Sequence, residues 1–322
     1  MATAEQIKSL IRSHLIADSE QFYTIALQVA AHEAQQGHGD LAHDIRTIID
    51  KAQREKKPQV SYFLQDLRGL VLSEEPSVPK STLVIPSSLQ SRIERIIHEH
   101  RQQQKLKNHG LSPRRKILLI GPPGTGKTLT TRVLAHELRL PLYTVQVDKL
   151  VTKFMGETSA KLRQIFDLIQ QETGVYLFDE FDAIGGERML ENDVGEMRRV
   201  LNSFLQFIEQ DVSNSLIVAA TNSPKLLDRA LFRRFDDVLY FELPTALDRR
   251  RLIENLLASF QAPNFPWKAI INESEGLSHA EIDQACRDAI KQVILSDEQT
   301  VTTSLLRQML KERQGLKRGL RS

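Results

Sequence analysis

Residues 121–128 have the composition and spacing of a phosphate-binding loop. The sequence GPPGTGKT fits the pattern G-x-x-x-x-G-K-[ST] and lies between an apolar strand pattern at 116–120 and a helical pattern at 128–138. Glycine lets backbone N–H groups converge on phosphate oxygens, and the start of a helix adds partial positive charge there. We expect Lys127 to reach the β- and γ-phosphates and Thr128 to bind Mg²⁺. The residues predicted to contact nucleotide here are Gly121, Pro122, Pro123, Gly124, Thr125, Gly126, Lys127 and Thr128.

Acidic and amide side chains follow two further apolar runs. VYLF at 175–178 leads into Asp179 and Glu180, and SLIVAA at 215–220 leads into Thr221 and Asn222. The carboxyl ends of parallel strands form the ligand-binding edge of an α/β sheet. Asp179 is therefore expected to hold Mg²⁺ through water, and Glu180 to act as general base on the attacking water. Asn222 is expected to touch both the γ-phosphate and that water.

Short apolar runs alternate with amphipathic stretches between residues 87 and 244. The runs lie at 116–120, 142–147, 175–178, 215–220 and 238–241. This alternation predicts an α/β domain whose parallel sheet is covered by helices on both faces. A C-terminal region at 245–322 follows, with helical patterns at 249–260, 280–295 and 304–313.

The N-terminal region has helical periodicity throughout. Apolar stripes in residues 4–55, with breaks at 17–19 and 37–40, predict a bundle of three short helices over 1–56. Residues 57–86 contain scattered prolines and are expected to be a linker. The apolar stretch SYFLQDLRGLVL inside this linker is expected to pack on one of its neighbours.

Composition excludes several classes of protein. The 322-residue chain is 41% hydrophobic, which is enough to bury a core, and its net charge of +2 gives no strong field for nucleic acid or an anionic membrane. The single cysteine, Cys286, excludes an intramolecular disulfide and multi-cysteine metal sites. No apolar run approaches the roughly 20 residues of a membrane span, and the N-terminus has no signal-peptide core. We therefore expect a soluble, cytoplasmic protein.

Four motifs, in the order GPPGTGKT, LFDEFDAI, AATN and ALFRRFDD, resemble those of AAA+ ATPases, specifically the AAA group of protein-remodelling enzymes. The likeness extends from about Leu83 to Asp297. It implies that the nucleotide is ATP, and that a five-stranded αβα domain is followed by a small helical lid. It also implies a homo-oligomeric ring, usually a hexamer, with each nucleotide at a subunit boundary.

Two more segments gain a role from this resemblance. Arg233 and Arg234 resemble the adjacent pair of spastin, katanin and the ESCRT-pathway ATPase, which implies that both reach the γ-phosphate of the neighbouring subunit. A surface salt-bridge pair is the alternative. The segment Lys153, Phe154, Met155 and Gly156 resembles the pore loop that grips polypeptide in AAA translocases; the alternative is that the phenylalanine caps the core. Residues 185–195 are a candidate second pore loop.

Two departures from the family pattern concern the base of the nucleotide. GLSHAE at 276–281 resembles G-h-S-G-A-[DE], with His279 in place of a glycine. His279 either contacts adenine or ribose, or simply starts the lid helix. The segment before the phosphate loop lacks the usual Asp-Val/Ile-Gly-Gly sequence, and the lid has no arginine at the nucleotide-sensing position of replication initiators.

The resemblance implies an ATP-hydrolysing motor that remodels, unfolds or threads a protein substrate. One alternative is a nucleic-acid-associated ATPase of the helicase-loader or transposition-helper type, which would need a basic pore or an added DNA-binding domain. Another is a switch that binds partners according to its nucleotide state. The N-terminal bundle resembles microtubule-interacting-and-trafficking modules, and the layout is similar to small bacterial AAA proteins paired with a subtilisin-like protease. The partners expected are therefore further copies of the chain, a protein substrate, and an adaptor or protease.

Overall fold

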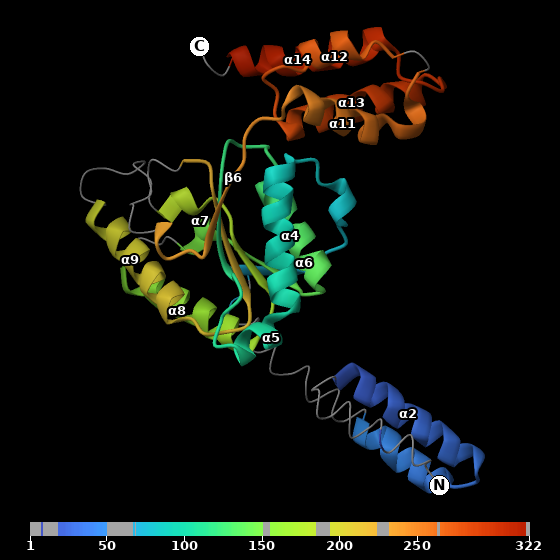
Figure 1. Cartoon of the computed structure of the whole chain (residues 1–322), viewed down its shortest axis with the longest axis vertical. Coiled ribbons are helices and arrows are strands. Elements are labelled where there is room, and N and C mark those ends of the chain that lie inside the picture. The colour runs from blue at the N-terminus through green and yellow to red at the C-terminus, as the bar shows by residue number, and fades with distance from the viewer. Residues whose placement is uncertain are drawn as a thin grey trace. The chain divides into compact units, whose positions relative to one another are not determined.

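The computed structural model describes residues 8, 19–49, 67, 69–150, 155–184, 194–223, 232–262 and 265–319. The chain divides into two units, residues 1–67 and 68–322 (Figure 1). In the first unit, helix α2 (Ser19–Gln35) and a helix at 39–49 are joined by a turn in which Gly37 has a φ of 87°. These are two helices of the predicted bundle. The first predicted helix lies outside the described residues, apart from Lys8.

The second unit is built on a six-stranded sheet in the order β1-β3-β4-β5-β2-β6. β1 pairs antiparallel with β3, and every other neighbouring pair is parallel. The five predicted parallel strands are confirmed. The strands are β1 (Val71–Glu74), β2 (Lys116–Ile120), β3 (Leu142–Val145), β4 (Val175–Phe178), β5 (Leu216–Thr221) and β6 (Asp237–Tyr240).

Strand β1 is a difference from the sequence analysis, because it lies within 57–86, the expected linker. Val71 pairs with Val145 of β3 and is buried, and the Gln146 N–H donates to the Leu70 carbonyl at 2.8 Å. Leu70 and Val71, near the end of the apolar stretch, therefore pack on the sheet, whereas residues 61–66 lie outside the described residues. A strand of four residues is too short for periodicity to distinguish it from a loop.

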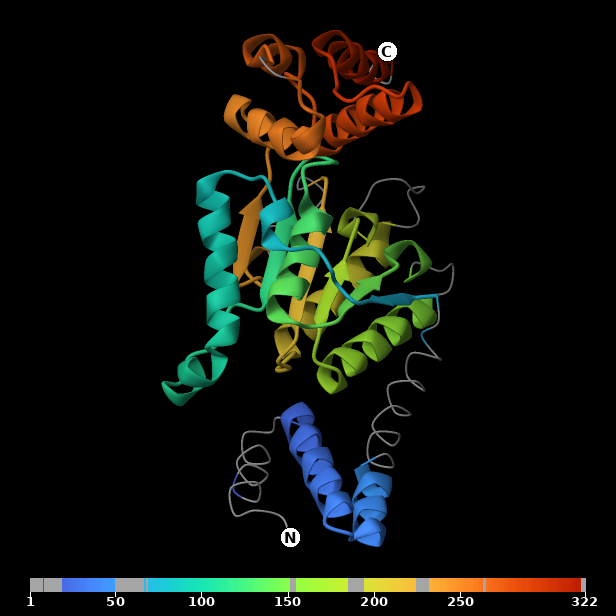
Figure 2. The same cartoon turned by 90° about the vertical axis from the view of Figure 1, so that its right-hand side faces the viewer.

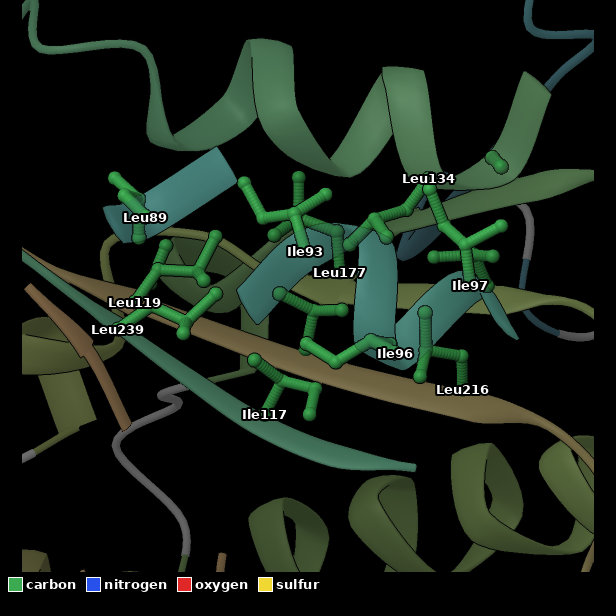
Figure 3. Packing of buried hydrophobic residues seen from close by; sticks show 14 of the residues in the cluster. Leu89, Ile93, Ile96, Ile97, Ile117, Leu119, Leu134, Leu177, Leu216 and Leu239 are labelled. Carbon is green, nitrogen blue, oxygen red and sulfur yellow. The ribbon is translucent and has the colours of Figure 1, made fainter. Parts of the chain in front are cut away.

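Helices cover both faces of the sheet (Figure 1). On one face, α4 (Ser87–Arg101) and α6 (Lys127–Leu138) pack aliphatic side chains against the strands, as Figure 3 shows. On the other face lie α8 (Met155–Gln171) and α9 (Val194–Gln210), where aromatic rings pack together; those of Phe178 and Phe204 have centroids 5.0 Å apart. The αβα architecture is confirmed. The short helices of this domain are η1 (Lys80–Thr82), α5 (Gln103–Asn108), α7 (Val147–Leu150) and η2 (Phe181–Ile184).

The C-terminal helices form a lid beyond the carboxyl ends of the parallel strands (Figure 2). Capping boxes start two of these helices: Thr245 caps α11 and pairs with Asp248 in its first turn, and Ser278 caps α13 and pairs with Glu281 in its first turn. The lid has its own core, in which Cys286 is fully buried. Its elements are α11 (Ala246–Leu257), η4 (Ala258–Phe260), α12 (Trp267–Glu273), α13 (His279–Leu295) and α14 (Thr303–Gly319). Within the described parts of the chain, no helix combines the length and the apolar character that crossing a membrane requires.

Candidate functional site

The loop between β2 and α6 is held in shape by its own polar groups. The buried Thr125 donates its hydroxyl hydrogen to the Pro122 carbonyl at 2.8 Å. Gly126 caps α6 with a φ of 98°, a left-handed conformation that side chains disfavour. Helix α6 therefore begins at Lys127, and its first backbone amides are available to an anion at the loop.

Lys127 is buried at the centre of the site. Its ammonium donates to the carbonyls of Gly121 and Pro122 at 2.7 and 2.9 Å, and to the amide oxygen of Asn222 at 2.7 Å. Burial lowers the pKa of Lys127, and the carboxylates of Asp179 and Asp182 act in the opposite direction. The structure thus brings Lys127 and Asn222 together. These two predicted site residues follow β2 and β5, which are neighbours in the sheet.

The two acids after β4 face different surroundings. Asp179 accepts a hydrogen bond from the Thr128 hydroxyl at 2.7 Å, so a carboxylate and a hydroxyl lie side by side. These are oxygen ligands of the kind that Mg²⁺ prefers, and the pair fits the predicted metal position. Glu180 is exposed and has a φ of 50°, and its N–H donates to an oxygen of Asp179 at 2.9 Å. This left-handed turn directs the chain away from the strand immediately after the predicted metal ligand.

A cavity of about 1080 Å³ opens over the phosphate loop. Its polar wall carries the phosphate-loop side chains together with Asp179, Glu180 and Asn222. The rest of the lining comes from the segment before α4 and from the lid and is mixed: Val78, Val84, Leu252 and Leu256 are apolar, whereas Glu254, Asp283 and Arg287 are charged. The cavity therefore places the phosphate-loop groups beside a mixed surface of lid side chains.

The lid contacts the phosphate loop directly at Gly124. The Ala280 N–H, in the first turn of α13, donates to the Gly124 carbonyl at 3.0 Å. A Cβ atom at Gly124 would lie 2.7 Å from the Ser278 hydroxyl oxygen and 3.1 Å from the Ala280 Cβ atom. Glycine at this position therefore permits the close approach of the lid to the loop.

His279 is the first residue of α13 and also lines the cavity, so both of its predicted roles keep support. Burial lowers the pKa of the imidazole, while the nearby Asp248 carboxylate and Val84 carbonyl act to raise it. Both ring nitrogens are covered, and neither makes a hydrogen bond of ordinary geometry with a described residue. The imidazole therefore lies near Asp248 of α11 and Val84 of the segment before α4, with both nitrogens shielded from solvent.

Arg233 and Arg234 lie outside the cavity of their own chain and differ in their contacts. Arg234 forms an ion pair with Glu209 of α9. Asp236 accepts the backbone N–H groups of 115–116, both at 2.9 Å, which fixes the run to the base of β2. Arg233 is exposed and makes no hydrogen bond or ion pair with another described residue.

The predicted pore segment is only partly described. Lys153 and Phe154 lie outside the described residues, whereas Met155 and Gly156 form the first turn of α8. Helix α8 thus begins within the segment that resembles the pore loop. Of the candidate second pore loop, only 194–195, in α9, belongs to the described residues.

Sequence reasoning assigned no role to Asp182, although it belongs to the quoted motif LFDEFDAI. In the structure, its Oδ1 atom accepts hydrogen bonds from Thr221 and Asn222 at the end of β5. The signal for this residue was its place two positions after Glu180. Acids follow strands in ordinary turns too, so the contact across the sheet could not be read from the chain alone.

Comparisons with known proteins identify the family. The family model described as "ATPase family associated with various cellular activities (AAA)" matches residues 117–243. An uncharacterized AAA family ATPase of Sinorhizobium fredii is 32% identical over 304 residues, which cover 92% of this chain and 90% of that relative. This chain belongs to the AAA family of ATPases. Its activity is the binding and hydrolysis of ATP.

Other relatives of this AAA ATPase are longer. Proteasome-activating nucleotidases of Thermococcus onnurineus and Pyrococcus abyssi are each 32% identical over 260 residues, or 77% of this chain. The chain spans 63% and 64% of their respective lengths. The crystal structure of the FIGL-1 AAA domain has a TM-score of 0.62 at 22% identity, covering 79% of this chain and 89% of that one. This likeness shows the shared fold.

Proposed function

We propose that this AAA ATPase forms a ring of six copies, which couples ATP hydrolysis to remodelling, unfolding or threading of a protein substrate. The observation that carries the proposal is the separation of two sets of residues. The groups suited to hydrolysis line one cavity, whereas the arginine pair lies outside that cavity in the same chain. The relatives named proteasome-activating nucleotidases support a protein substrate.

Within one subunit, we propose that three side chains act on the triphosphate. Lys127 neutralises charge on the β- and γ-phosphates, Glu180 accepts a proton from the attacking water, and Asn222 orients that water. Thr128 and Asp179, whose oxygens lie 2.7 Å apart, would hold Mg²⁺. Bound Mg²⁺ would supply charge stabilisation at the phosphate oxygens.

Between subunits, the two arginines take different parts in this proposal. Arg233 is exposed and makes no hydrogen bond or ion pair with another described residue, so it can reach a phosphate bound by the next subunit. Arg234 forms an ion pair with Glu209 within its own chain, and in this proposal it holds the backbone next to Arg233 in place. An arginine that arrives from a neighbour stabilises transition-state charge, so that hydrolysis depends on assembly.

A mixing experiment tests the shared site. Neither Arg233→Ala/Arg234→Ala nor Lys127→Ala should hydrolyse ATP at the wild-type rate alone, because each lacks one half of the site. Mixed rings contain boundaries at which an intact cavity meets an intact arginine pair, so mixing should restore part of the ATPase rate. Absence of rescue, with subunit exchange demonstrated by labelled chains, would rule out the shared site.

The class of substrate is tested by stimulation of the ATPase. An unfolded protein should raise the hydrolysis rate above that in buffer, because a threading motor turns over faster when engaged. Single-stranded DNA at equal mass should have no effect. Stimulation by DNA and not by protein would instead favour the helicase-loader class, and equal rates in all three conditions would favour a nucleotide-dependent switch.

A further inference from the structure

Asp182 connects the ends of two strands at the catalytic edge of the sheet. It lies in η2, directly after β4 and two residues beyond Glu180. Its Oδ1 atom accepts a hydrogen bond from the Thr221 hydroxyl at 3.2 Å and another from the Asn222 backbone N–H at 3.4 Å. One carboxylate oxygen therefore links the chain after β4 to the end of β5.

Both sides of this link are anchored in the core. Phe181, the residue before Asp182, is fully buried, and its ring centroid lies 4.5 Å from that of Phe204. Thr221 is fully buried as well, and its hydroxyl oxygen also accepts the Ser223 N–H at 3.0 Å. Asn222 lies between these fixed points, just beyond the end of β5, and is exposed. The bond to its N–H therefore restrains a residue that the sheet itself no longer holds.

The restraint continues to the phosphate loop. The amide oxygen of Asn222 accepts from the Lys127 ammonium at 2.7 Å, so Asp182, Asn222 and Lys127 form one chain of hydrogen bonds. The carboxylate of Asp182 also acts against burial to raise the pKa of Lys127. Among the described residues, Asp182 has no ion-pair partner within salt-bridge distance. Its contacts in the described structure are these hydrogen bonds.

We propose that Asp182 is a positioning residue for ATP hydrolysis, which orients Asn222 through the backbone N–H of that residue and through Thr221. Asn222 can act on the γ-phosphate and the water only if its side chain starts from a fixed backbone. A displacement of about 1 Å in a positioning group can cost on the order of 100-fold in rate. This role rests on ATP hydrolysis alone and holds whether or not the ring threads protein.

The test compares variants of the full chain in nucleotide binding and in turnover. Asp182→Ala should lower kcat by on the order of 10- to 100-fold, with ATP affinity within about 3-fold of wild type, because positioning is lost while the phosphate loop stays intact. Asp182→Asn keeps an oxygen acceptor in the same place and should retain most of the activity. Asp167→Ala, which removes an exposed carboxylate on α8, is the matched control and should leave kcat unchanged.

Combining the change with Asn222→Ala separates positioning from folding. If Asp182 acts through Asn222, Asp182→Ala/Asn222→Ala should be no slower than Asn222→Ala alone. Additive losses in kcat, or a lower melting temperature with unchanged kcat, would overturn the proposal. Equal loss in the Asn and Ala variants would do so too, because the charge and not the acceptor would then matter. If the alanine variant does not fold, Thr221→Val, which removes one of the two donors, should still lower kcat without loss of ATP binding.

Discussion

At the scale of single residues, the charged side chains of the site differ in their exposure to solvent. Lys127 is buried, which lowers its pKa, and two nearby carboxylates favour its charged form. Glu180, by contrast, is exposed at a left-handed turn. These surroundings support the proposed division of roles, in which Lys127 neutralises phosphate charge and Glu180 acts on the attacking water.

This division predicts different defects for two substitutions. Lys127→Ala should abolish nucleotide binding, because it removes the ammonium that meets the phosphates. Glu180→Gln should keep binding and lose turnover by at least about 100-fold, because a general base contributes on the order of 10²–10⁴ in rate. Binding of a fluorescent ATP analogue and release of phosphate, measured on the same samples, check both. Equal loss of binding in the two variants would contradict the assignment.

At the scale of elements, the lid and the phosphate loop meet through a glycine. The first turn of α13 donates a backbone hydrogen bond to Gly124, and the space beside that glycine is filled by Ser278 and Ala280. The same lid also lines the cavity, with Leu252 and Leu256 among its residues. The position of α13 therefore affects both the shape of the cavity and the contact with the phosphate loop.

Gly124→Ala should separate the lid from the loop. Gly124 and Gly110 have similar left-handed φ values, 73° and 71°, but a Cβ atom at Gly110 would meet nothing within 4 Å. Gly110→Ala therefore pays only the backbone strain, about 1–2 kcal/mol, and serves as the matched control. We expect Gly124→Ala to weaken ATP binding at least about 10-fold more than the control, equivalent to about 1.4 kcal/mol. Equal affinities in a titration of the two variants would show that the lid contact does not matter.

The half-buried His279, whose ring nitrogens are both covered, predicts an acid sensitivity of the lid. Its pKa is lowered in the folded state, whereas in the unfolded chain it takes up a proton near pH 6.5. The unfolded state therefore binds more protons as the pH falls through about 6.5, so stability is full above that pH and declines below it. Fluorescence of Trp267, the single tryptophan and a residue of α12, reports lid unfolding.

When the pH is lowered from about 7.5 to about 5.5, the melting temperature of His279→Asn should fall by less than that of the wild type. The buried His100, whose pKa is also lowered, contributes to both proteins and sets the remaining dependence. Parallel melting curves of the two proteins would contradict a buried, neutral His279.

At the scale of the whole molecule, the proposed work depends on a ring and on the segment before α8. Phe154→Ala should leave basal ATPase intact, because it lies on a different loop from Lys127, Glu180 and Asn222. Stimulation by an unfolded protein should collapse, while Phe154→Tyr should be tolerated and Met155→Asp should be as damaging as the alanine change.

The alternative for Phe154 gives a different result in the same experiment. If its ring caps the core, Phe154→Ala should lower the free energy of unfolding by about 3–5 kcal/mol. A large fall in melting temperature with stimulation by substrate intact would mean that the residue is structural and would contradict its predicted role in the pore.

Sequence alone determined which edge of the sheet carries the candidate site. The phosphate loop, the acids after β4 and the asparagine after β5 each follow a buried apolar strand, and parallel strands place their carboxyl ends at one edge. Because each motif lies within a few residues of its strand, local pattern was enough to predict that Lys127, Asp179 and Asn222 meet.

Tertiary structure decided the contacts between distant segments. The pairing of β1 with β3, the bond from Ala280 to Gly124 and the link from Asp182 to β5 join residues far apart in the chain. Periodicity reports that a face is buried but not which element covers it. The physical reason is that such contacts depend on the packed position of whole helices and strands, which no local stretch of side chains specifies.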